Sequence, residues 1–108
     1  ENANKFERFI FDLIRYTDKV LLVETPRDEE FCPIKSVEGD ETLAKAQQFM
    51  SNLYGKWLRK CGLDVPTDSH GNVVGVIEIS PLFALDEEEL KEKIPSVGKF
   101  TGSLCLEP

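Results

Sequence analysis

A long helical stripe in the middle of the chain constrains the fold more than any other feature. Apolar side chains recur three or four residues apart from Leu43 to Cys61, over about five turns. Asp40 precedes this stripe as a possible cap, and Gly62 follows it as a typical C-terminal stop. A helix of this length with one apolar face needs a sheet or a second helix to cover it.

Weaker patterns flank that helix and complete an α+β prediction. Asn4 and Glu7 resemble a capping pair, and Phe6, Phe9 and Leu13 continue from them on one helical face. Before the central helix, the chain order predicts a helix from Asn4 to about Thr17, a buried strand over Lys19–Thr25 and a loop over 27–39. After the central helix, it predicts a strand over Val73–Ile79 with a hairpin partner at Val65, and then a short helix at Leu85–Leu90 that ends before Pro95. A last strand is predicted over Phe100–Leu106. We therefore expect a small, mostly antiparallel sheet packed against two main helices.

Length and charge narrow the class of protein. The 108 residues allow one domain, and 41% hydrophobic with 31% charged residues is a globular balance. A net charge of -7 argues against a nucleic-acid polymer or an anionic membrane as partner. Cys32, Cys61 and Cys105 are widely spaced, which favours reduced thiols and a cytoplasmic location over disulfides or a zinc site. The apolar runs are too short to span a bilayer, and no secretion signal opens the chain.

Three basic residues are the candidates for chemistry. Lys5 lies in the first turn of the predicted first helix, where free N–H groups and the helix dipole attract an anion such as phosphate. Arg27 and Lys35 lie on a charged loop and are secondary candidates for phosphate binding. The alternatives are an exposed surface lysine and a solvated charge run. His70 is typical of a turn residue, and no nucleotide-binding glycine motif or metal-ligand spacing occurs.

Four segments, in order, resemble the eukaryotic UDP-N-acetylglucosamine pyrophosphorylases. Residues 2–12 (NANKFERFIFD) are similar to that family's N-[AG]-x-K-x-E-x-F-[IV]-F-D segment. Glu24 to Lys35 resembles E-x-x-R-x-x-E-F-x-P-x-K, Trp57 lies at the place of a helix tryptophan, and residues 78–82 match E-I-S-P-L. The chain departs from the pattern at Thr25-Pro26, Cys32 and Ser36, which concerns details of the loop.

The resemblance implies a uridylyltransferase. Such enzymes make UDP-N-acetylglucosamine and pyrophosphate from UTP and N-acetylglucosamine 1-phosphate, with Mg²⁺. It also implies that residues 1–108 are a single C-terminal domain of a larger α/β nucleotidyltransferase, whose catalytic domain with the nucleotide loop and metal ligands lies upstream. The absence of an initiator methionine at Glu1 fits this expectation.

Lys5 maps onto the family's phosphate-contacting lysine, while Arg27 and Lys35 stay secondary. The competing hypothesis is a packing or self-association domain that takes no part in chemistry. The isolated chain is expected to be inactive.

Overall fold

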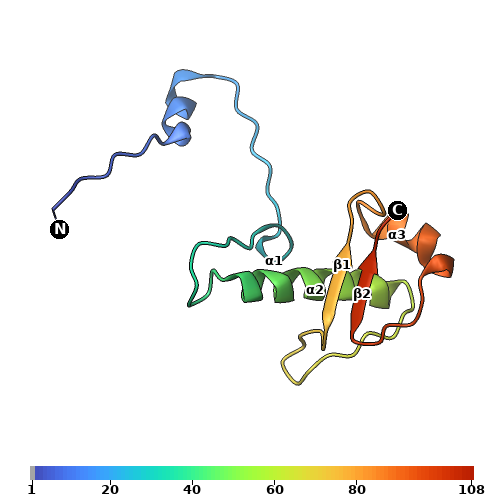
Figure 1. Ribbon diagram of the computed structural model, residues 1–108. Coiled ribbons are helices and arrows are strands. Elements are labelled where there is room, and N and C mark those ends of the chain that lie inside the picture. Colours follow the sequence, from blue (N-terminus) through green and yellow to red (C-terminus); the bar gives the residue numbers. More distant parts are fainter. Residues whose placement is uncertain (1) are drawn as a thin grey trace.

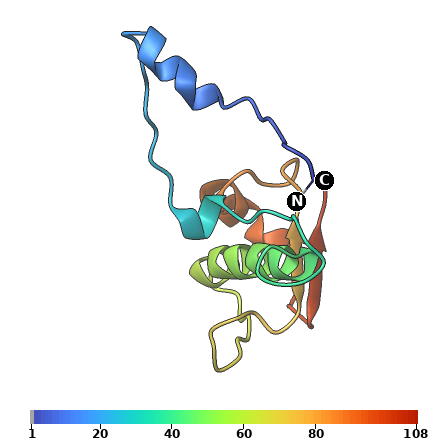
Figure 2. The same ribbon diagram turned by 90° about the vertical axis from the view of Figure 1, so that its left-hand side faces the viewer.

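The computed structural model describes residues 2–108, and its folded body comprises the second half of the chain (Figure 1). Its elements in chain order are η1 (Ile10–Tyr16), α1 (Arg27–Glu30), α2 (Leu43–Lys60), β1 (Val76–Ile79), α3 (Glu87–Lys93), η2 (Ile94–Ser96) and β2 (Ser103–Leu106). Helix α2 packs on β1 and contacts α3, β1 pairs with β2, and residues 2–25 form an N-terminal arm that leaves this body (Figures 1 and 2).

The predicted central helix is confirmed as α2. Its N-cap is Thr42, whose Oγ1 accepts a hydrogen bond from the Lys45 N–H at 3.2 Å, while the predicted cap Asp40 pairs with the Lys45 ammonium instead. Gly62 follows the helix with a φ of 91°, in the left-handed region that glycine adopts without strain. The stripe therefore produces one long helix with local signals at both ends.

One core joins the elements of the body. Leu58 of α2 and Leu90 of α3 are fully buried, and Ile77 and Ile79 of β1 are 2% exposed. Trp57 and Tyr54 pack against this core as partly buried side chains, with ring centroids 5.4 Å apart in an edge-to-face arrangement. The remaining buried members of the core cluster are Val65, Val73, Ala84 and Leu106.

The predicted antiparallel sheet is wrong, because β1 and β2 pair in parallel. Val76 is opposite Ser103, and Ile79 is opposite Leu106. The connection between the strands contains α3 and η2, and a crossover of this kind returns the chain in the same direction as it left. The overall class stays α+β, but the small sheet is a two-stranded parallel one.

The predicted hairpin that starts at Val65 is present only as one short pairing. A single antiparallel bridge joins Thr67 and Val73, and the strand begins only at Val76. The bridge is made by the Val74 N–H, which bonds the Pro66 carbonyl at 3.0 Å, and the Asp68 N–H, which bonds the Asn72 carbonyl at 2.8 Å. The Val73 N–H instead bonds Asn52 Oδ1 of α2 at 2.8 Å. Gly75, with a φ of 131°, then turns the chain into β1 beside the Gly102 carbonyl, where a Cβ would clash.

The arm departs most from the sequence prediction. The first helix is a short 3-10 helix over Ile10–Tyr16 with no buried residue, and Lys19–Thr25 forms no strand. An isolated helix of this length is marginal in water, because packing of its apolar face supplies most of its stability. No second main helix therefore packs on the sheet in the described residues. None of the helices in residues 2–108 has the length and apolar character that crossing a membrane would require.

Candidate functional site

Lys5 lies in the extended part of the arm, ahead of any helical turn. Helical structure begins at Ile10, and the first turn bond runs from the Asp12 N–H to the Phe9 carbonyl at 3.2 Å. The predicted cap Asn4 lies in the same extended stretch. The placement of Lys5 in a first helical turn is therefore wrong for this structure, and no helix end adds to its charge here.

The side chain of Lys5 is 84% exposed and pairs with the Glu7 carboxylate. Residues 2–5 line an open hollow in which this ammonium is the cation. Exposed ion pairs of this kind contribute little, about 0–1 kcal/mol. The ammonium is therefore accessible to an anion, and its present partner is readily exchanged.

Arg27 is fixed by its own short helix. Pro26 precedes it, and the guanidinium lies 4.2 Å from the centre of the Phe31 ring, a cation–π contact across one turn of α1. A carboxylate of α1, Glu29, pairs with Lys56 of α2. The Glu29 carboxylate raises the pKa of Lys56, first through this hydrogen bond and then through its charge. Arg27 thus lies on a helical turn that is attached to the body.

Lys35 closes the loop of residues 35–41 through two contacts with Glu41. Its N–H bonds the Glu41 carbonyl at 2.8 Å, and its ammonium lies 3.4 Å from Glu41 Oε1. The N-terminal part of the arm, to which Lys5 belongs, lies well away from α1 (Figure 1). The structure therefore does not bring the three predicted basic residues together.

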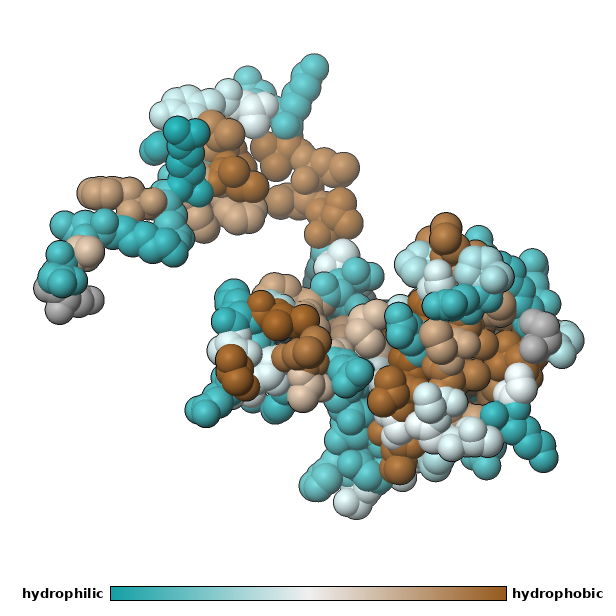
Figure 3. All heavy atoms as spheres, viewed as in Figure 1, coloured by the Kyte–Doolittle hydropathy of each residue, from teal (hydrophilic) through white to brown (hydrophobic). Residues whose placement is uncertain are grey.

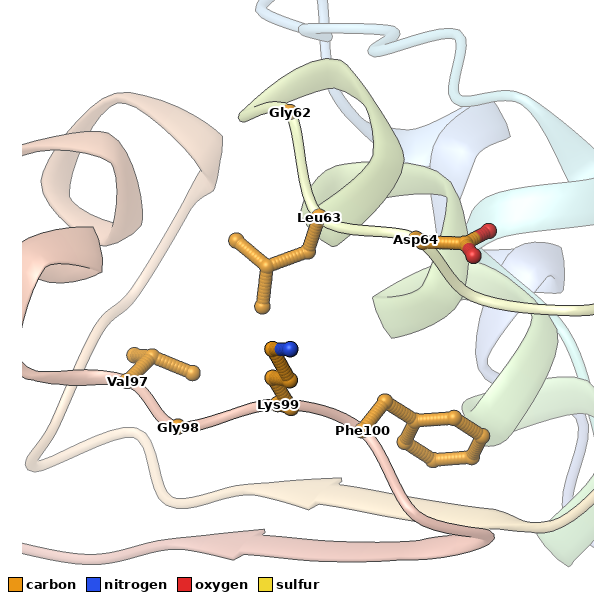
Figure 4. Close-up of a pocket in the computed structure, with 7 residues that line it drawn as sticks. All are labelled: Gly62, Leu63, Asp64, Val97, Gly98, Lys99 and Phe100. Atoms are coloured by element: carbon orange, nitrogen blue, oxygen red, sulfur yellow. The ribbon is translucent and has the colours of Figure 1, made fainter.

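A hollow that the sequence did not indicate lies between the end of α2 and the segment before β2. Figure 4 shows the Leu63 and Lys99 side chains directed toward one another across it, with Val97 and Phe100 beside Lys99. Its residues come from 62–64 and 97–100, which are far apart in sequence. Spacing gave no signal for this site, since only the tertiary fold joins the two segments. The charged groups of this lining are one ammonium, of Lys99, and one carboxylate, of Asp64, and the lining offers no nucleophile–base pair.

A second hollow follows α2 and β1 on the body. Tyr54 and Glu78 lie on its wall, and burial, with the Glu78 charge as a smaller cause, raises the pKa of the Tyr54 phenol. Among its other lining residues are Ile34, Met50 and Glu107. This wall is apolar and acidic, so it is unsuited to a phosphate.

Metal binding has no support in residues 2–108. They contain no group of three or more His, Cys, Asp or Glu side chains placed to hold an ion. Cys32, Cys61 and Cys105 are free thiols. His70 is exposed in a turn, where its N–H bonds Asp68 Oδ1 at 2.8 Å, as expected of a turn residue.

Comparison with known proteins identifies relatives. The chain is 31% identical over 93 residues to a probable UDP-N-acetylglucosamine pyrophosphorylase of Dictyostelium discoideum, covering 83% of this chain and 18% of that protein. It is 33% identical over 93 residues to UDP-N-acetylglucosamine diphosphorylase 1 of Arabidopsis thaliana, covering 81% and 17%. It is 27% identical over 104 residues to the human UDP-N-acetylhexosamine pyrophosphorylase-like protein 1, covering 83% and 20%.

These matches confirm the resemblance on which the sequence prediction rests. The chain spans about 18% of the length of the first relatives. No family model matches the chain. No solved structure matches it either.

Proposed function

The chain is a relative of the UDP-N-acetylglucosamine pyrophosphorylases, and we propose that it is part of a uridylyltransferase of that kind. The observation that carries this proposal is the similarity, at 31–33% identity over more than four-fifths of the chain, to proteins with that name. The proposed reaction joins UTP and N-acetylglucosamine 1-phosphate in the cytoplasm. A phosphate oxygen of the sugar phosphate attacks the α-phosphorus of UTP, and the bond from that phosphorus to the departing pyrophosphate breaks.

Lys5 is the proposed contribution of this chain to the reaction. Negative charge builds on the phosphoryl oxygens as pyrophosphate leaves, so a fixed cation beside them stabilises the transition state more than the ground state. An ammonium that is 84% exposed and held by one carboxylate can reach such a group. Arg27 and Lys35 have local partners, at Phe31 and Glu41, which supports a smaller role in phosphate binding.

Mg²⁺ enters the proposal through the resemblance alone. The described residues provide no fitting set of ligands for it. We propose that the nucleotide-binding and metal-binding groups lie in the part of the protein that corresponds to the remaining four-fifths of these relatives.

Steady-state kinetics of the intact protein with UTP and N-acetylglucosamine 1-phosphate test the proposal. We expect Lys5→Ala to lower kcat by about 10²–10³, the usual loss of one preorganised donor. Lys5→Arg should restore only part of the rate, because the planar guanidinium of arginine does not replace the compact ammonium of lysine. The matched control is Lys45→Ala, an exposed lysine that also has one carboxylate partner, Asp40.

Equal kcat and KM values for the Lys5→Ala and Lys45→Ala variants would exclude Lys5 from the reaction and favour the packing or self-association hypothesis. Failure of the intact wild-type protein to form UDP-N-acetylglucosamine would reject the uridylyltransferase itself. The 108-residue chain alone is expected to form none.

A further inference from the structure

The hollow along α2 and β1 (the α2–β1 hollow) has no part in the proposed reaction. Its helix side presents the apolar side chains of Leu43 and Met50, which are 68% and 40% exposed, and Ile34 of the preceding loop is 58% exposed. Figure 3 shows apolar surface over the loop that leads into α2. The volume of the hollow is about 510 Å³, within the range of ligand sites.

The strand side of this hollow contains a backbone donor without an acceptor. The Ser80 N–H bonds the Leu106 carbonyl on the β2 side at 2.9 Å. The backbone groups of successive strand residues point to opposite edges, so the N–H groups of Ile77 and Ile79 point away from β2. Ser51 Oγ accepts the Ile77 N–H at 3.1 Å, whereas the Ile79 N–H has no hydrogen-bond partner among residues 2–108. Ile79 borders the hollow, so a carbonyl bound there would satisfy this donor.

Two further polar groups of the lining are also without partners. Glu78 is exposed, and none of the lysine and arginine side chains in the described residues pairs with it. The Tyr54 phenol forms no hydrogen bond within the same residues. Glu107 adds a second carboxylate to the lining. The hollow therefore combines an apolar wall with uncompensated negative charge, which is complementary to a cation that has apolar neighbours.

An extended peptide matches the backbone donor, the carboxylates and the apolar wall together. A strand added at a sheet edge binds through main-chain hydrogen bonds, and its alternate side chains give the specificity. A second copy of this chain matches less well, because each copy carries a net charge of -7 and would bring further negative charge to Glu78 and Glu107.

We propose that the α2–β1 hollow binds an extended basic segment of a partner protein. A backbone carbonyl of this segment accepts the Ile79 N–H, a lysine or arginine side chain pairs with Glu78, and an apolar side chain packs against Met50. The proposal concerns a different surface from that of Lys5 and does not depend on the uridylyltransferase reaction.

Peptide binding to the intact polypeptide, measured by fluorescence anisotropy, tests the proposal. The probe is a labelled octapeptide of alternating valine and threonine with one central lysine, and its counterpart carries glutamate instead. We expect the lysine peptide to have a Kd at least about tenfold lower than the glutamate peptide, and Glu78→Lys should reverse this order. The matched control is Glu92→Lys, which makes the same change of net charge at an exposed residue of α3 outside the hollow.

Three results of this experiment would overturn the proposal. Equal affinities of the two peptides would remove the charge pairing, and a reversal by Glu92→Lys would show that net charge alone is responsible. Failure of the intact wild-type polypeptide to bind either peptide would show that its hollow is not open to a partner.

Hydrogen exchange of single amides provides a second test. Saturation of the intact polypeptide with the lysine peptide should slow exchange of the Ile79 amide by ~10-fold or more, with less change at Ile77, whose N–H is already bonded to Ser51. Unchanged exchange at Ile79 would reject the backbone bond. In sedimentation velocity, a dimer that the lysine peptide dissociates would show that a second copy fills the hollow and would reject a separate partner.

Discussion

Gly55 lies in the middle of α2 and packs directly against the loop that follows the helix. A Cβ added there would lie 2.5 Å from Val73 Cγ2, with Arg59 Nη1 at 3.4 Å and Val65 Cγ1 at 3.5 Å. Real Cβ atoms do not approach a side-chain carbon as closely as 2.5 Å. Either Val73 or the helix must therefore shift in the Gly55→Ala variant.

Two effects of opposite sign decide the stability of this variant. Alanine is favoured over glycine inside a helix by about 0.8–1.0 kcal/mol. Extra volume in a packed core costs about 1–3 kcal/mol, and Val73, at 3% exposed, has little room to retreat. We expect a net loss of about 1 kcal/mol in the free energy of unfolding, against the gain that helix propensity alone predicts.

Urea unfolding of the 108-residue chain, followed by far-UV circular dichroism, measures this free energy. The same substitution in a Val73→Ala background removes the closest clash, so there it should stabilise by about 1 kcal/mol. A gain in stability for Gly55→Ala in the wild-type background would refute the packing argument. An equal loss in both backgrounds would show that Val73 is not the cause.

Two further predictions concern polar groups of the body. Ser51→Ala leaves the buried Ile77 N–H without a partner and should lower the free energy of unfolding, measured in urea, by about 1–3 kcal/mol. The control Ser36→Ala, at an exposed serine, should change this free energy by less than about 0.5 kcal/mol. Equal losses in the two variants would contradict the role of Ser51. Hydrogen bonds from the Asn72 N–H, and from the His70 N–H, hold the pKa of the Asp68 carboxyl below its usual value. The ionised Asp68 carboxylate therefore stabilises the folded state fully above about pH 4, and this stabilisation is lost as the pH falls through the lowered pKa. Thermal midpoints measured between pH 5 and 2 should accordingly fall less steeply for Asp68→Asn than for the wild type.

The sequence predicted the elements whose signals are local. Helix α3 is an example: Asp86 Oδ1 accepts from the Glu89 N–H at 2.9 Å, and the Glu89 carboxylate accepts from the Leu85 N–H at 2.9 Å. Both bonds join residues within five positions, so the cap and box pattern predicted them. The parallel sheet was accessible in principle, because a helix between two strands is a crossover, but the antiparallel prediction paired Val65 with the strand that follows it.

The prediction failed in the arm for a different physical reason. The patterns in Phe6–Ile14 and Lys19–Thr25 show which faces require burial, but no pattern shows what buries them. A short helix or a lone strand gains most of its stability from packing and pairing, and the arm makes neither contact in the described residues.

Lys5 illustrates the same point. A first helical turn at Lys5 requires a covered helix face at Phe6 and Phe9, but these side chains are 93% and 66% exposed. The proposed role of Lys5 therefore depends on its exposed ammonium and not on a helix N-terminus. If the charge alone provides the interaction, Lys5→Arg, which keeps the charge, should restore part of the kcat that Lys5→Ala loses.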